Sequence, residues 1–185
     1  MPKVQAATAA EICSRFNLDP GAKALLRDGM GLREFAEALY RNKLHVAGID
    51  FMAHALGARE AIWWGCLCFQ HIAGEAMTDV EKNACRAAVQ WILQPLEENR
   101  AAARIPAETA GPATVAGALA SAAFQTGGNI APPGVPAMAP GPFAPAKSVA
   151  IAVKVACTKG DPARIVETQR SFFELGVGVA EGRYI

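Results

Sequence analysis

The sequence predicts an all-α, single-domain protein. Alanine, the strongest helix former, makes up roughly a fifth of the 185 residues. Apolar residues recur at helical spacing, whereas the alternating runs of β-branched and polar residues that are typical of strands are nearly absent. A chain of this length can bury a core of its own. We therefore expect about eight helices in an irregular bundle or a short solenoid-like stack, since no fixed repeat period is apparent.

The first part of the chain contains four segments with helix signals. Asp19 before Pro20 is typical of a helix start, because the carboxylate caps the helix and proline loses nothing at the first helical position. Glycines 29 and 31 interrupt the chain, and Gly57 ends the fourth segment. The expected helices span about residues 6–16, 20–26, 32–41 and 44–56.

The next helix, which ends near Gly74, carries two adjacent tryptophans. It begins with Arg59 and Glu60 and is then apolar on every side over residues 61–69, so the rest of the protein or a partner must cover it. Each indole N–H also needs an acceptor when it is buried. We interpret one set of residues as a structural core motif: His54, Arg59, Glu60, Trp63, Trp64 and Trp91. Alternatively, Arg59 and the tryptophans form an anchor for a partner, because both residue types are frequent interface hot spots.

Local signals also place the helices that follow. Thr78 and Glu81 form a T-x-x-E capping box at the start of an amphipathic helix. Pro95 ends that helix or starts the next, in which glutamates 97 and 98 and arginines 100 and 104 are expected to form a solvated face. A helix of very small residues is expected from Pro112 to Phe124.

Residues 126–146 form a different kind of segment, with six prolines, four glycines and no charge. Such a composition predicts a long loop rather than a helix, and a long structureless loop is usually functional or disordered. Its apolar side chains anchor it either across the helical body or into a partner protein, since proline-rich segments are common recognition elements. The candidate partner-binding residues are Ile130, Val135, Met138 and Phe143.

Two helices are expected after this loop. Residues 147–158 form a buried helix, although their β-branched run also fits a strand. Asp161 and Pro162 start a final helix that ends near Leu175. The glycine-rich residues 176–185 are expected to form a flexible tail.

Charge and composition narrow the class of function. The net charge of +1 gives no basic footprint for nucleic acid, and the longest apolar run, about nine residues, is too short to cross a membrane. The N-terminal residues lack the apolar region of a signal peptide. Five cysteines without framework spacing fit buried free thiols. We therefore expect a cytoplasmic protein that binds neither nucleic acid nor membranes.

No catalytic or metal-binding constellation stands out, and no cofactor is expected. Cys66 and Cys68, two apart on a helix, point away from each other, so with His71 they are poorly placed to share a zinc ion. There is no G-x-S-x-G motif and no phosphate-binding loop. The alternative is an enzyme whose site is assembled from distant residues, of which the candidates are His54, Arg59, Glu60 and Cys66.

Three motifs in this order resemble a little-studied bacterial all-helical domain family: Arg-Glu-Ala-x-Trp-Trp, Trp-x-x-x-Pro-x-x-x-Asn-Arg and Gly-Gly-x-x-x-Pro-Pro. The resemblance covers most of the chain. Members of that family often occur near type VI secretion components. The resemblance therefore implies a non-enzymatic adaptor or co-chaperone that helps load an effector or spike-tip protein. A self-associating structural subunit is a further alternative.

Overall fold

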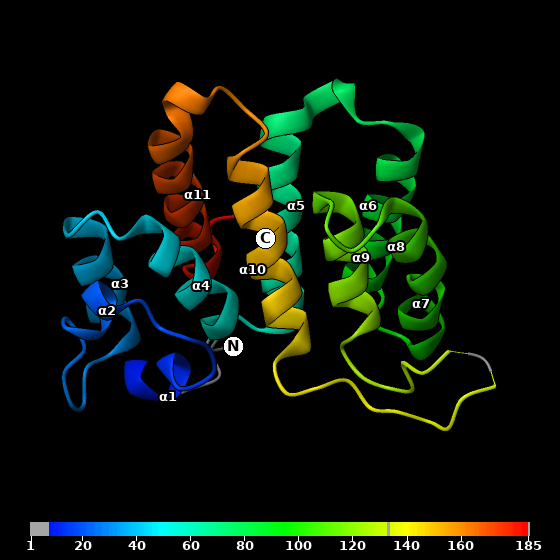
Figure 1. The fold of residues 1–185 in the computed structure, drawn as a ribbon, viewed down its shortest axis with the longest axis horizontal. Helices are drawn as coiled ribbons and strands as arrows, with labels where there is room; N and C mark the ends of the chain where they lie inside the picture. Colours follow the sequence, from blue (N-terminus) through cyan, green and yellow to red (C-terminus); the bar gives the residue numbers. More distant parts are fainter. Residues whose placement is uncertain (1–7, 133, 185) are drawn as a thin grey trace.

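The computed structural model describes residues 8–132 and 134–184, and these fold into one all-helical body without strands (Figure 1). Eight of the α-helices are seven residues or longer, and two short 3-10 helices complete the set. The helices are α1 (Ala9–Cys13), α2 (Pro20–Lys23), α3 (Leu32–Arg41), α4 (His45–Ala55), α5 (Ala58–Ala73), η1 (Gly74–Ala76), α6 (Asp79–Leu93), α7 (Glu97–Ala102), α8 (Arg104–Ala110), α9 (Val115–Phe124), α10 (Ala144–Cys157), η2 (Pro162–Arg164) and α11 (Ile165–Ala180).

Helices α5 and α10 lie side by side through the middle of the molecule (Figure 1). Helices α1 to α4 and α11 lie on one side of this pair, and α6 to α9 lie on the other. The predicted all-α fold class is confirmed, and the segment with the ambiguous β-branched run is the helix α10. Within the described residues no helix has the length and apolarity that a membrane span needs.

Capping explains where several helices begin. The predicted box at α6 is present, with the Thr78 hydroxyl accepting from the Glu81 N–H and the Glu81 carboxylate accepting from the Thr78 N–H. Helix α3 has the expected bounds. The expected start of α9 at Pro112 is wrong, because the Thr114 hydroxyl accepts from the Gly117 N–H and the helix begins at Val115.

The two N-terminal helices are shorter than expected. Helix α1 ends at Cys13 rather than Phe16, and its expected start at residue 6 lies outside the described residues. Helix α2 ends at Lys23 rather than Leu26.

Two further boundaries after the loop differ from the expectation. Helix α10 begins at Ala144 instead of Lys147, because Pro145 occupies the first turn, where a missing N–H costs nothing. Helix α11 continues to Ala180 instead of ending near Leu175. Gly176 does not end the helix, and its lack of a side chain serves packing, because a Cβ at this position would lie 3.0 Å from the Trp64 ring. Gly176 therefore lets α11 approach the tryptophan helix closely.

The core is built around Trp64 and a set of very small residues. Trp64 is fully buried and donates its indole N–H to the Phe172 carbonyl over 2.9 Å. Trp63 is half-buried and donates to the Tyr184 carbonyl over 2.7 Å. Helix α9 buries five alanines, and with so little side-chain bulk it packs closely against α5, α6, α8 and α10.

Candidate functional site

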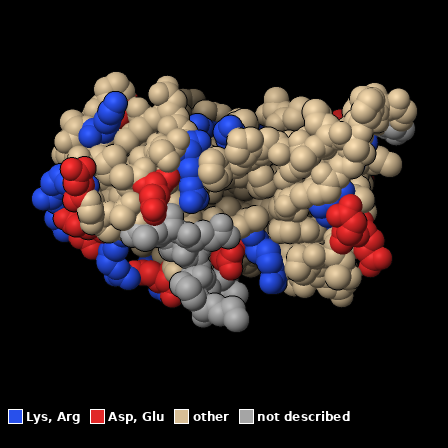
Figure 2. Space-filling model, turned by 90° about the horizontal axis from the view of Figure 1, so that it is seen from below, with Lys and Arg blue, Asp and Glu red and all other residues tan. Residues whose placement is uncertain are grey.

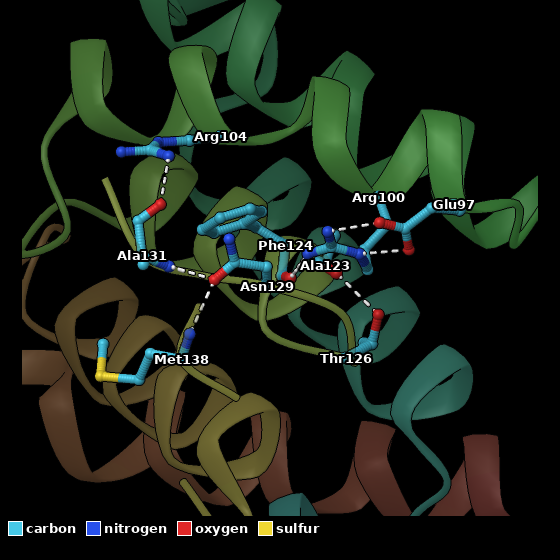
Figure 3. Close-up of polar contacts among 9 residues, drawn as sticks. All are labelled: Glu97, Arg100, Arg104, Ala123, Phe124, Thr126, Asn129, Ala131 and Met138. Carbon is cyan, nitrogen blue, oxygen red and sulfur yellow. Dashed lines mark hydrogen bonds and ion pairs between the residues drawn. The ribbon is translucent and has the colours of Figure 1, made fainter. Parts of the chain in front are cut away.

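The described residues of the Pro/Gly-rich segment run over one face of the molecule. We call residues 126–143 the apolar loop; they connect α9 to α10. Figure 2 shows this face, on which a broad area in the right half carries almost no charged residue. Three polar side chains hold the loop in place: Arg100 and Arg104 from neighbouring helices, and Asn129 within the loop itself (Figure 3).

Arg100 supports the beginning of the loop from beneath. Its side chain is buried, and its Nη1 donates to the Phe124 carbonyl over 2.6 Å at the end of α9. Its Nε and Nη2 each donate over 2.7 Å to the Glu97 carboxylate, and this pairing lowers the pKa of Glu97. Gly128, at φ +65°, passes so close that a Cβ would lie 2.5 Å from the guanidinium. The expectation that Arg100 belongs to a solvated face is therefore wrong, because the loop covers it.

Asn129 and Arg104 close the middle of the loop into a lobe. The Asn129 Oδ1 accepts from the Ala131 N–H over 3.0 Å and from the Met138 N–H over 2.8 Å (Figure 3). The Ile130 N–H donates to the Met138 carbonyl over 2.8 Å. Arg104 reaches across from α8 and donates to the Ala131 carbonyl over 2.9 Å. These bonds fix where the lobe begins and ends, at residues 130 and 138.

The apolar side chains of the lobe are turned toward solvent. Val135 is 54% exposed and Met138 is 53% exposed, whereas Ile130 is half-buried. The structure thus brings the candidate partner-binding residues Val135 and Met138 to one exposed segment. Ile130 instead lies where that segment joins the helical body.

Phe143 anchors the far end of the loop. It adopts a left-handed conformation, with φ 58°, as the N-cap of α10. The Arg15 guanidinium carbon lies 4.9 Å from the centre of its ring, and the His54 ring lies edge-on to it at 6.5 Å. Phe143 nevertheless remains 43% exposed. It therefore packs against the helical body with one face and contributes the other to the apolar surface.

The core-motif residues lie at different depths: His54, Trp64 and Trp91 are buried, Glu60 and Trp63 are half-buried, and Arg59 is exposed. His54 is buried, with Nδ1 2.8 Å from the Asp50 carbonyl and its ring stacked on Phe16 at 4.8 Å, and its burial lowers its pKa. Arg59 donates through Nε to the Ile92 carbonyl over 2.9 Å, at the C-terminal end of α6 where a positive charge is favourable. Trp91 is buried in α6.

The four residues of the enzyme alternative are not gathered into one site. Within the described part of the chain, no hydrogen bond, ion pair or ring contact joins any two of His54, Arg59, Glu60 and Cys66. Cys66 lies half-buried on α5, and burial raises the pKa of its thiol, which disfavours the nucleophilic thiolate. Three cavities, one between α3 and α11, one between α6 and α8 and one beside α2 and α4, are lined by other residues.

Sequence reasoning missed the three residues that shape the loop. The role of Asn129 could have been predicted, because an asparagine after two glycines often accepts hydrogen bonds from nearby backbone N–H groups. The roles of Arg100 and Arg104 could not have been predicted, because their hydrogen-bond partners lie 24 and 27 residues away along the chain.

Comparison with known proteins places the chain in a family but gives it no activity. No curated protein matches it, and no solved structure matches it. Residues 35–180 match the model of a family of unknown function, DUF6931. That span contains the tryptophan helix, the apolar loop and all of α11. The chain is therefore a member of the DUF6931 family.

Proposed function

We propose that this chain is a non-enzymatic adaptor that binds another protein through the apolar loop. The observation that carries the proposal is the contrast between the two parts of the loop. Arg100 holds the end of α9 and Arg104 and Asn129 bond to the backbone of Ala131 and Met138, while the side chains of Val135 and Met138 are more than half exposed. Apolar side chains held in a fixed, uncharged surface favour association with a partner, because binding removes them from water without ordering a flexible segment.

The backbone of the loop indicates what kind of partner surface it fits. Pro136, Pro140 and Pro142 are each fixed near the φ of a polyproline helix, and each biases the residue before it toward extended conformations. Residues 136–141 have no regular secondary structure. Extended, proline-rich segments are recognised by grooves lined with aromatic side chains. We therefore propose a partner that presents an uncharged, aromatic groove.

The resemblance to chains found near type VI secretion components supplies a candidate for the partner. We propose that the partner is a secretion effector or a spike-tip protein, which the adaptor would hold before loading. The lack of a gathered catalytic set among the described residues favours this binding role over the enzyme alternative.

The test compares capture of the partner by the wild-type chain and by the double variant Val135→Ser, Met138→Ser. Both positions are exposed, so we expect the variant to fold with an unchanged melting temperature. Tagged protein is used to capture partners from the host, and the captured protein is then purified and titrated calorimetrically. We expect the variant to bind at least tenfold more weakly, as two apolar contacts of about 1 kcal/mol each would predict.

A matched control removes an exposed apolar side chain elsewhere. Val166 on α11 is 60% exposed and lies outside the loop, so Val166→Ser should leave binding unchanged. Equal loss of binding in this control and in the loop variant would contradict the proposal. Capture that is unaffected by the loop variant would contradict it as well.

A further inference from the structure

Helices α3, α4 and α11, which lie on the side of the molecule away from α6 to α9 (Figure 1), line an apolar slot between α3 and α11. Two side-chain contacts bridge the helices. Arg33 pairs with Glu181 at 3.2 Å, and the Tyr40 hydroxyl donates to the Glu174 carboxylate. Arg33 and Tyr40 lie seven residues apart on α3, and Glu181, directly after α11, lies seven residues after Glu174, so the helices are antiparallel and the bridges lie two turns, or about 10 Å, apart.

The space between the bridges is lined by small and apolar residues. Ala36 of α3 and Val177 of α11 lie midway between the two bridges, and Phe51, Met52 and Ala55 of α4 contribute to the lining. The cavity has a volume of about 500 Å³. Ligand sites are typically apolar clefts of about 300–1,000 Å³ with a few polar groups at fixed places. The slot has this size and character.

The charges around the slot are unevenly distributed. At one end, Arg33 and Arg183 both pair with Glu181, at 3.2 and 2.8 Å. Among the described residues, Glu181 is the one carboxylate within ion-pair distance of either guanidinium, so this end carries an excess positive charge. Glu37 is matched by Arg41 on the same helix, and Glu174 lies 3.8 Å from Arg170. The excess positive charge is thus confined to the Arg33 end.

We propose that this slot binds an aliphatic carboxylate of the fatty-acid class. Its chain lies along the apolar lining between α3 and α11, and its carboxylate contacts Arg33 and Arg183. A guanidinium carries five N–H donors in a planar fork, so each arginine has donors for a second carboxylate beside Glu181. The site is separate from the apolar loop, and its ligand does not depend on the adaptor role.

The test titrates the full chain with dodecanoate and, in parallel, with dodecan-1-ol, both below their aggregation limits. We expect saturable binding of one dodecanoate per chain and at least tenfold weaker binding of the alcohol, because a hydrogen bond to a charged group is stronger than a neutral one. In Arg33→Gln, dodecanoate should lose this advantage while the alcohol binds as before. Failure of dodecanoate to bind saturably would overturn the proposal, and so would equal affinity for the two ligands.

Two variants separate the slot from general surface effects. Ala36→Leu places a larger side chain between α3 and α11, keeps good helix propensity and should abolish binding of both ligands. Arg27→Gln removes another exposed arginine, paired with Glu34 at 2.6 Å but not lining the slot, and should change neither affinity. Circular dichroism confirms that each variant is folded. Unchanged dodecanoate binding in folded Ala36→Leu would place the ligand elsewhere and overturn the assignment.

Discussion

Replacement of Arg100 by methionine tests how the apolar loop is held. The guanidinium makes a charge-assisted bond to the Phe124 carbonyl and lies over the Phe124 ring, with its carbon 5.0 Å from the ring centre. A hydrogen bond from a charged group contributes about 1.5–3 kcal/mol, and a cation–π contact about 0.5–1 kcal/mol. Methionine keeps most of the buried side-chain volume. We therefore expect Arg100→Met to lower the free energy of unfolding by about 2–4 kcal/mol.

The assay is urea unfolding, followed by amide hydrogen exchange on the folded variant. Exchange should accelerate at residues 126–131, because the Phe124 carbonyl, at the end of α9 just before the loop, loses its donor. The matched variant is Glu97→Gln, which removes the charge of the exposed ion-pair partner and leaves the bond to Phe124 in place. It should be clearly less destabilising, because the Glu97 side chain is exposed and glutamine keeps an oxygen that can accept from the guanidinium. Equal destabilisation by the two variants, or unchanged loop exchange in Arg100→Met, would refute this reasoning.

Three further predictions concern packing, protonation and thiol reactivity. Gly48→Ala should lower the free energy of unfolding by about 1–3 kcal/mol in a denaturant titration, because the added Cβ would lie 2.7 Å from the Phe173 ring and overpacking outweighs the gain in helix propensity; an unchanged stability would contradict it. Burial lowers the pKa of His54 and of His45. The unfolded chain therefore takes up protons more readily than the native one, and the free energy of unfolding should fall as the pH drops below about 6.5. Unfolding measured between about pH 7.5 and 5.5 should show this loss, and His54→Phe should reduce it; a variant with the wild-type slope would contradict the role of His54. Burial raises the pKa of the cysteine thiols, to about 11 for Cys13 and Cys85 and to about 12 for Cys157, so alkylation at pH 8 followed by mass spectrometry should be slow in the native protein and fast in urea. Rapid native labelling of any of the three would contradict that expectation.

Local sequence signals predicted most of the helices. Alanine content, the capping box at Thr78 and the apolar spacing in residues 32–41 depend on interactions within one or two turns, so they can be read from adjacent residues. The extension of α11 past Leu175 could not be predicted from adjacent residues. Its glycines are tolerated because Trp64, more than a hundred residues earlier in the chain, packs against Gly176.

The candidate site was predicted only in part. An uncharged run with six prolines is visible in the sequence, and so are Val135 and Met138 as its apolar side chains. The role of Arg100 and Arg104 in holding the loop could not be predicted, because in the sequence both look like ordinary exposed helix residues. The slot between α3 and α11 depends on contacts 134 and 148 residues apart, such as those from Tyr40 to Glu174 and from Arg33 to Glu181, and no local pattern predicts such pairs.

The buried alanines of α9 also constrain how this sequence can change. Alanine has no rotamers, so a core made of it loses no side-chain entropy on folding, and it has no side chain that can rotate aside to admit an extra methyl group. A larger residue on α9 requires a smaller one on the facing helix. Opposite Gly65 of α5, for example, Leu119 already fills the space where a Cβ would lie. Substitutions across this contact are therefore expected to be accepted in pairs, so that the effect of each one depends on whether the other is present.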